Sequence, residues 1–320
     1  MKAIPYGRQH ITEEDIQTVI ETLQSDYLTQ GPKIAEFEEA FANYVGSKYA
    51  VAVSNGTGAL HLCALALGVK EGDKVITTPI TFAASANCIR YCGGEVVFSD
   101  IDPETYLIDI NKVRTLLESA PKGTYKGVIP VDFAGRANNL EAFRKLADEF
   151  GLWIIEDACH APGGSFLDAG NVSQTCGNGQ FAELAIFSFH PVKHIASGEG
   201  GMITTNDELL YKKLLQLRTH GIVKNDGLYT NSIELAGGQE TYPGWYMEMQ
   251  VLGFNYRLTD FQAALGLSQL SRADEGIKRR REIALNYFNA FKNKSFIKGQ
   301  SKSIEGHAYH LYIIEVEDRL

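Results

Sequence analysis

Short apolar runs alternate with amphipathic stretches along most of this chain. The apolar runs predict strands at 49–53, 74–79, 95–102, 127–133, 152–157, 185–190, 200–206 and 310–316. The amphipathic stretches predict helices at 12–24, 33–45, in the Ala/Leu-rich run after Gly58, and at 82–93, 139–150, 259–272 and 275–292. The polar, glycine-rich stretch 224–247 predicts a long loop.

Strands that alternate with helices are typical of an α/β fold, in which a mostly parallel sheet is covered by helices on both faces. Ligands of such sheets bind at the carboxyl ends of the strands. Four candidate features fall at these ends: Asn55–Gly58, Pro79–Phe82, Asp157 and Ser188–Lys193.

Composition narrows the class of protein. The chain has 320 residues, enough for a large domain and a smaller one, and its net charge of -9 disfavours nucleic acid or an anionic membrane as a general partner. The first residues form no secretory signal, and no apolar run approaches the ~20 residues of a membrane span. Five irregularly spaced cysteines form no zinc pattern, so we expect reduced thiols, no metal and a cytoplasmic protein.

The glycine turn Gly56-Thr57-Gly58 follows a strand and opens a helix. A nicotinamide fingerprint would need glycine where His61 stands, and the lysine of a Walker loop is missing. Two interpretations remain, a plain N-cap turn or a helix N-terminus that binds one phosphate.

The other candidates also have ordinary explanations when each is taken alone. Asp157 ends an apolar strand and could cap a following helix, while His160, three residues on, could be a core histidine on the same side of a helical turn. Phe82 could belong to the core or stack on a flat ligand. Lys193, in a tight turn five residues after Ser188, is either a partner in an ion pair or a nucleophile.

Together these residues fit one molecule, pyridoxal 5'-phosphate (PLP). A carboxylate such as Asp157 keeps the pyridine nitrogen protonated, an aromatic ring such as Phe82 stacks on the cofactor, and a lysine such as Lys193 bonds to its carbonyl carbon. The helix N-terminus at Gly56 and the Ser188 hydroxyl would bind the phosphate.

Six sequence blocks resemble the DegT/DnrJ/EryC1/StrS family of sugar aminotransferases. They are SNGTGALHL, TTPITFAASAN, IIEDACHAPG, FSFHPVKHIASGEGG, LRTHGI and GFNYRLTDFQAALGLSQL, in the order that the family has them. The resemblance implies the type I PLP-dependent aminotransferase fold, with a mostly parallel seven-stranded sheet and a smaller C-terminal α+β domain. It divides the chain into a large PLP-binding domain at 1–250 and the start of the small domain at 251–320, which is incomplete because family members continue further.

The resemblance also implies roles for individual residues. Lys193 would form the Schiff base, Asp157 would pair with the pyridine nitrogen and Phe82 would stack on the ring. His160 would face the ring hydroxyl. The phosphate would be held by Gly56, Thr57, Ser188 and, from a neighbouring subunit, Asn255, so that the enzyme is a homodimer with shared sites. The positions implied for substrate binding are Tyr6, Asp26, Tyr27, Leu28 and Thr29.

Within the family, the opening block and the HPVKHIASGEGG block are most similar to enzymes of pseudaminic acid biosynthesis. The implied substrates are therefore a UDP-linked 4-keto-6-deoxy sugar, aminated at C4, and glutamate. Three alternatives stay open: an aminotransferase for a dTDP-4-keto-6-deoxyhexose or a UDP-4-keto-pentose, a related dehydratase, and a truncated PLP-binding protein without turnover. The dehydratases carry histidine where Lys193 stands, which disfavours them. Residues 165–184 form a long segment of undefined role.

Overall fold

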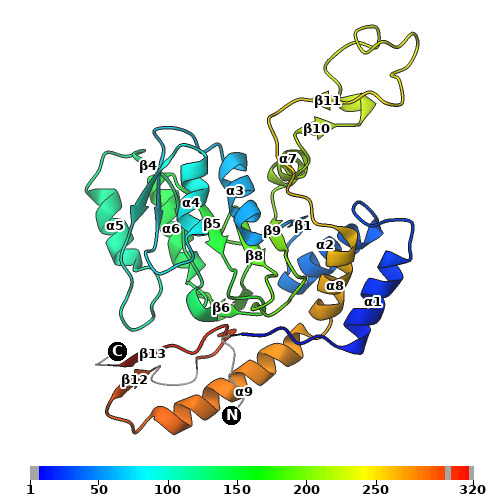
Figure 1. The fold of residues 1–320 in the computed structure, drawn as a ribbon. Helices are drawn as coiled ribbons and strands as arrows, with labels where there is room; N and C mark the ends of the chain where they lie inside the picture. Colours follow the sequence, from blue (N-terminus) through cyan, green and yellow to red (C-terminus); the bar gives the residue numbers. More distant parts are fainter. Residues whose placement is uncertain (1–6, 300–303, 317–320) are drawn as a thin grey trace.

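A seven-stranded sheet forms the centre of the computed structural model, which describes residues 7–299 and 304–316 (Figure 1). Its strands are, in spatial order, β1 (Tyr49–Val53), β9 (Gly201–Thr205), β8 (Leu184–Ser188), β5 (Trp153–Asp157), β4 (Tyr125–Ile129), β2 (Lys74–Thr77) and β3 (Glu95–Phe98). Strand β9 is antiparallel to both of its neighbours, and every other pair is parallel. The predicted mostly parallel sheet is confirmed.

Helices cover both faces of this sheet. The helices are α1 (Glu13–Leu23), α2 (Pro32–Val45), α3 (Gly56–Ala66), α4 (Ala84–Tyr91), α5 (Ile110–Glu118), α6 (Leu140–Phe150), α7 (Glu208–Arg218), α8 (Asp260–Leu270) and α9 (Ala273–Phe291). Alternate strand residues point to opposite faces, so Val51 packs in the core under α3, α4 and α7, whereas Ala52 packs in the core under α2 and α8. Helices α5 and α6 extend the second layer over β2, β4 and β5. No helix in the described ranges combines the length and apolarity needed to cross a bilayer.

Helix α8 follows the predicted domain boundary at residue 250 and packs against α1 and α2. The buried Asp15 of α1 explains part of this packing, since it accepts hydrogen bonds from Ser268 Oγ (2.7 Å) and Gln269 Nε2 (2.7 Å) and pairs with Arg272. The charge of Arg272 compensates the burial of the carboxylate. The division at residue 250 stays a prediction.

Several elements differ from the sequence prediction. Helices α5 and α7 were not predicted, although Asp207 caps α7 with bonds to the amides of Leu209 and Leu210. The predicted strand 310–316 is wrong in its first half, because only β13 (Ile314–Val316) is a strand, and it pairs with β12 (Ile297–Gly299) outside the main sheet. Residues 165–184 contain the hairpin of β6 (Ser165–Leu167) and β7 (Ser173–Thr175).

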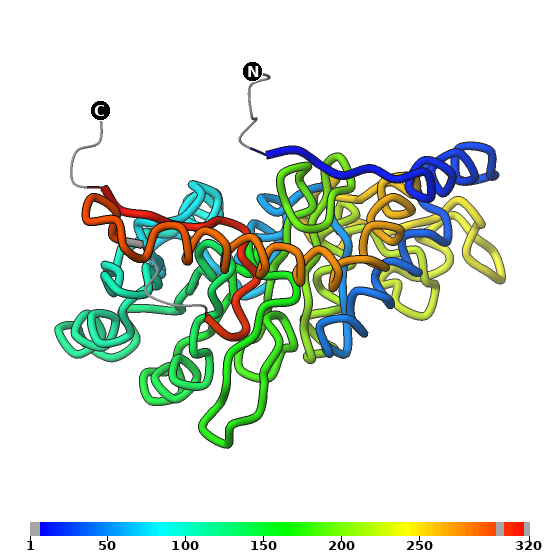
Figure 2. The backbone as a smooth tube through the Cα atoms, turned by 90° about the horizontal axis from the view of Figure 1, so that it is seen from below, coloured from blue at the N-terminus to red at the C-terminus, as the bar shows by residue number. Residues whose placement is uncertain are grey.

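Two segments leave the main body or return to it. The predicted loop is confirmed as an arm that projects away from the sheet between β10 (Ile222–Val223) and β11 (Glu248–Met249) (Figure 1). At the base of the arm the buried Glu248 carboxylate accepts bonds from the amides of Thr230 and Asn231. Figure 2 shows α9 crossing the underside of the molecule, and the red segment that leads to β13 running back alongside it.

Candidate active site

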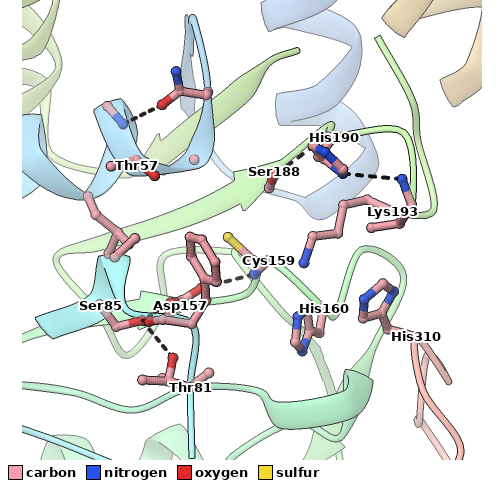
Figure 3. Close-up of a pocket in the computed structure, with 18 of the residues that line it drawn as sticks. Thr57, Thr81, Ser85, Asp157, Cys159, His160, Ser188, His190, Lys193 and His310 are labelled. Atoms are coloured by element: carbon pink, nitrogen blue, oxygen red, sulfur yellow. Dashed lines mark hydrogen bonds between the residues drawn. The ribbon is translucent and has the colours of Figure 1, made fainter. Parts of the chain in front are cut away.

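A cavity of about 910 Å³ opens where β1, β2, β5 and β8 end. Seven of the predicted site residues line it, drawn from these four strand ends: Gly56, Thr57, Phe82, Asp157, His160, Ser188 and Lys193. Figure 3 shows how those that it labels converge. The expected position of a ligand site at the carboxyl ends of the strands therefore agrees with the geometry.

The N-terminus of α3 forms one end of the cavity. Asn55 caps the helix by accepting the Gly58 amide at 2.8 Å, which leaves the amides of Gly56 and Thr57 for a ligand. A Cβ atom at Gly56 would lie 3.1 Å from Ser188 Cβ, so glycine permits the close approach of β8 to this helix. The free amides and the Ser188 hydroxyl are suited to binding a phosphate.

Asp157 ends β5 and lines the cavity, with only 4% of its surface exposed. Its Oδ2 accepts a 2.6 Å hydrogen bond from Ser85 Oγ, and its Oδ1 accepts the Cys159 amide at 3.2 Å. Ser85 is in turn hydrogen-bonded to Thr81 across 2.7 Å. A turn rather than a helix follows β5, so Asp157 is not a helix cap. These bonds fix the carboxylate at a position where a protonated ring nitrogen would neutralise it.

Lys193 follows β8 in a short turn closed by the bond from its amide to His190 O, at 2.8 Å. Its amine is directed into the cavity (Figure 3). Burial lowers the pKa of Lys193, with the nearby Cys159 and Asp157 opposing the shift. A lysine with a lowered pKa has a larger fraction of free amine, which is the nucleophilic form.

His160 is a neutral imidazole at the cavity wall. Its Nδ1 accepts the Ala134 amide at 3.3 Å, so the ring proton lies on Nε2. Burial lowers the pKa of His160 to about 3, with the charge of Lys193 adding to the effect. The ring is thus a hydrogen-bond donor through Nε2, and it lies in a turn rather than in a helical turn as the sequence suggested.

Phe82 lines the cavity with 73% of its surface exposed. Interpreting it as a core residue is therefore wrong. An exposed aromatic ring at the mouth of a cavity is available to stack on a flat ligand.

The remaining predicted residues lie apart from the lining. Asn255 is exposed and forms an isolated bridge with Thr219. It precedes helix α8, which was predicted at 259–272 and begins at Asp260 behind its Thr259 cap. Asp26, Tyr27, Leu28 and Thr29 form an exposed turn, and Leu28 O accepts the Asp260 amide at 3.0 Å. Tyr6 lies outside the described residues.

Several residues that line the cavity had no role assigned from the sequence, among them Ser85, Thr81 and His310. Ser85 and Thr81 are four residues apart at the start of α4, a spacing that was visible in the sequence but not used. His310 comes from the far end of the described chain, and no local pattern indicates its position here.

The donor set fits PLP. The Gly56 and Thr57 amides with Ser188 could hold the phosphate, and Asp157 offers a buried acceptor for a protonated ring nitrogen. The absence of a side chain at Gly56 also fits a bound phosphate, because a side chain there would fill the space between the helix N-terminus and Ser188. The half-buried lysine, Lys193, completes the set that this cofactor requires.

Comparison with known proteins agrees with this chemistry. Residues 9–320 match the sequence model of the DegT/DnrJ/EryC1/StrS aminotransferase family. The chain is 39% identical over 317 residues to the spore coat polysaccharide biosynthesis protein SpsC of Bacillus subtilis, covering 99% of this chain and 76% of that protein. It is 38% identical over 314 residues to the UDP-4-amino-4,6-dideoxy-N-acetyl-beta-L-altrosamine transaminase of Campylobacter jejuni, covering 97% and 76%.

Among solved structures, the chain is similar to Helicobacter pylori PseC, an aminotransferase involved in the biosynthesis of pseudoaminic acid. The TM-score is 0.84 at 32% identity, and the match covers 99% of this chain and 78% of that one. The match therefore extends through the sheet, the cavity and the segment that carries His310.

Proposed function

Because this chain belongs to the DegT/DnrJ/EryC1/StrS aminotransferase family, whose enzymes depend on PLP, we propose that it aminates the C4 ketone of a UDP-linked 4-keto-6-deoxy sugar. Glutamate is the proposed amino donor, and UDP-4-amino-4,6-dideoxy-N-acetyl-β-L-altrosamine is the proposed product. The similarity to the Campylobacter transaminase and to PseC supports this choice of sugar. The observation that carries the proposal is the half-buried side chain of Lys193 in one cavity with Asp157 and the α3 N-terminus.

When bound, PLP accepts the electron pair of the bond that breaks at the substrate carbon. Lys193 is proposed to move the proton to and from that carbon. Its position after β8 suits the task, since the turn closed at His190 O fixes its backbone while four methylene groups leave the amine free to move. The lowered pKa of Lys193 favours the free-amine form that a general base needs.

Asp157 and His160 are proposed to set the electronic state of the cofactor ring. The Asp157 carboxylate, held by Ser85 and the Cys159 amide, would keep the ring nitrogen protonated. The Nε2–H of His160 would donate to the ring hydroxyl oxygen, because the Ala134 amide already occupies Nδ1. Both contacts stabilise the polarised ring without moving during the reaction.

A second copy of the chain is proposed to complete the site. Asn255 is exposed and outside the cavity lining, a position from which it could reach a partner's cavity. The arm next to it carries an exposed apolar surface in which Trp245 is 72% exposed, and a partner chain would cover such a surface. Its other exposed apolar residues are Leu228, Leu235, Met247, Met249 and Leu252.

The test begins with protein that carries pyridoxamine phosphate. UDP-linked and dTDP-linked 4-keto-6-deoxy sugars are added separately, and the return of the PLP absorbance is followed together with the mass of the aminated sugar. The expected result is conversion with the UDP-linked sugar. Faster conversion of the dTDP-linked sugar, or of a UDP-4-keto-pentose, would replace the proposed substrate. Cofactor binding without conversion of any sugar would contradict the proposed activity.

A further inference from the structure

The segment from Ile304 to Tyr312 brings His310 to the cavity lining. Ala308 N donates to Gly135 O at 2.7 Å, and Leu311 N donates to Ala134 O at 3.1 Å. Gly135 has a φ of 97°, and a Cβ atom there would lie 2.8 Å from Tyr309 N and from the carbonyl oxygen of His160. The segment thus lies against the loop that also donates to His160, through backbone contacts that only glycine allows.

A second contact joins this segment to the lysine turn. His194, directly after Lys193, is hydrogen-bonded through Nε2 to Ala308 O at 3.0 Å, so Nε2 carries the proton. Arg280 of α9 donates to the carbonyl oxygens of Tyr309 and His310. Contacts from two sides therefore hold residue 310 in place.

The His310 side chain enters the cavity from this segment (Figure 3). Its ring centroid lies 4.3 Å from that of His160, with 33° between the ring planes, and 5.6 Å from that of His194. Its Nδ1 is buried and has no hydrogen-bond partner in the described chain. Buried polar atoms are nearly always paired, so this Nδ1 is an exception, and the contacts found for the ring are its packing on His160 and His194.

The charges around His310 favour a neutral ring. Burial lowers its pKa, and the groups that face it, His160, Lys193, His194 and Arg280, lower it further. Burial also lowers the pKa of His194 to about 3. A charged imidazole next to Lys193 would repel the protonated lysine, whereas a neutral pair of packed rings excludes water without adding charge.

We propose that His310 is a positioning residue with two effects. Its ring packs on His160, so that the Nε2–H of His160 keeps one direction, and the same ring excludes water from Lys193. This inference rests on the proposed function, because both residues act on the bound cofactor. His310 acts through its ring face rather than through its ring nitrogens. The C-terminal part of the described chain thereby takes part in a site otherwise formed by strand ends.

Two substitutions separate the ring face from the nitrogens. His310→Phe keeps an aromatic ring against His160, and His310→Ala removes the ring and admits water. Tyr312→Phe is the control, since Tyr312 lies in the same segment but outside the cavity lining and packs on Tyr287. Each variant is loaded with PLP, and the absorbance of the bond between Lys193 and PLP is titrated with pH, independently of turnover.

In His310→Ala, water reaches the nitrogen that joins Lys193 to PLP and stabilises its protonated form. We therefore expect the pH midpoint of this titration to rise by about half a unit to one unit. We also expect kcat to fall about tenfold with little change in either KM, because positioning acts on the chemical step. His310→Phe and Tyr312→Phe should both titrate like the unsubstituted protein. A His310→Phe variant as impaired as His310→Ala would overturn the proposal, since it would assign the role to a ring nitrogen.

An unchanged midpoint and kcat in His310→Ala would also overturn it. Circular dichroism and PLP stoichiometry of each variant show whether the fold and the cofactor site are retained, and His310→Phe still tests the proposal if the alanine variant does not fold. Borohydride reduction of the unsubstituted protein separates the two levels of inference. Failure to fix PLP on Lys193 would contradict the proposed function, whereas fixation with unaffected His310 variants would contradict only the positioning role.

Discussion

The carboxyl groups of Asp132 and Glu156 lie within 4.8 Å of each other and of the Cys176 thiol, and none of the three residues is more than 2% exposed. The backbone amide of Asn138 donates to Asp132 Oδ1 at 2.8 Å, and the backbone amide of Gly177 donates to Glu156 Oε2 at 2.9 Å. The second oxygen of each carboxyl has no partner in the described chain. Burial raises the pKa of Asp132 to about 6 and the pKa of Glu156 well above its usual range, so the pair retains a proton near neutral pH.

This pair should make stability depend on pH. Because both pKa values are raised in the folded state, the folded protein binds protons that the unfolded chain releases. The contribution of the Asp132–Glu156 pair to folding stability is therefore fully present below the unfolded pKa values of about 4. It is lost as the pH rises through about 6 and beyond. We predict that Glu156→Gln, which removes the titrating carboxyl but keeps a hydrogen-bonding group, raises the free energy of unfolding by about 1 kcal/mol at pH 8.

The measurement is urea unfolding of both proteins at pH 5 and pH 8. The Glu156→Gln variant should show a smaller loss of stability between the two values than the unsubstituted protein. Glu118→Gln, at an exposed position on α5, is the control and should leave the pH dependence unchanged. Equal pH dependence in all three proteins would show that the buried pair does not titrate in this range.

Asp157→Asn should retain the fold and lose most of the activity. An amide cannot accept hydrogen bonds at both positions, so either the Ser85 or the Cys159 contact weakens. It also cannot hold a protonated ring nitrogen by charge, and a charge-assisted hydrogen bond contributes ~1.5–3 kcal/mol. We expect kcat/KM to fall at least about tenfold, measured at full PLP occupancy. Near-normal turnover would limit Asp157 to a structural role.

Two inactive variants should complement each other if a second subunit completes the site. Lys193→Ala removes the proposed catalytic amine, and Asn255→Ala removes the proposed contact to the partner's phosphate. A mixed dimer would hold one site with both changes and one with neither, so about half of the unsubstituted activity should return. The two variants are co-expressed with different tags, and the doubly tagged species is assayed. Inactivity of a verified mixed dimer, with both parents inactive, would contradict shared sites.

Gly135→Ala should destabilise the protein and impair the site together. The left-handed φ of 97° costs ~1 kcal/mol in alanine, and the added Cβ atom would meet Tyr309 N and the carbonyl oxygen of His160. Gly123→Ala is a matched control, because its φ is 87° and a Cβ atom there would meet nothing within 4 Å. We expect thermal unfolding at a lower temperature in both variants, and a lower kcat in Gly135→Ala alone. A normal kcat there would show that the segment moves without disturbing the cavity.

The sequence predicted those parts of the site that depend on local pattern. Asp157 and Lys193 each end or follow an apolar run, and such runs place their last residues at one edge of a parallel sheet. The α3 N-terminus could be predicted for the same reason, because an apolar strand pattern is followed directly by a glycine turn. Residues 165–184 and helix α7 escaped prediction, although the Asp207 cap of α7 was present in the sequence.

Contacts between distant parts of the chain could not be predicted in this way. The bond from Ser85 to Asp157 depends on how α4 packs on the sheet, and His310 depends on a backbone contact with Gly135. The exposed position of Phe82 likewise follows from the shape of the cavity mouth rather than from its neighbours in sequence.

The tie between Gly135 and the segment around His310 also has a consequence for folding. It joins positions about 170 residues apart, and such closures are slow because the intervening chain must be ordered first. During synthesis Lys193, Asp157 and the α3 N-terminus leave the ribosome well before His310 does. Most of the residues proposed to hold the cofactor are therefore synthesised before His310, which completes the cavity lining. Binding of the cofactor and completion of the cavity around it can then occur at different times.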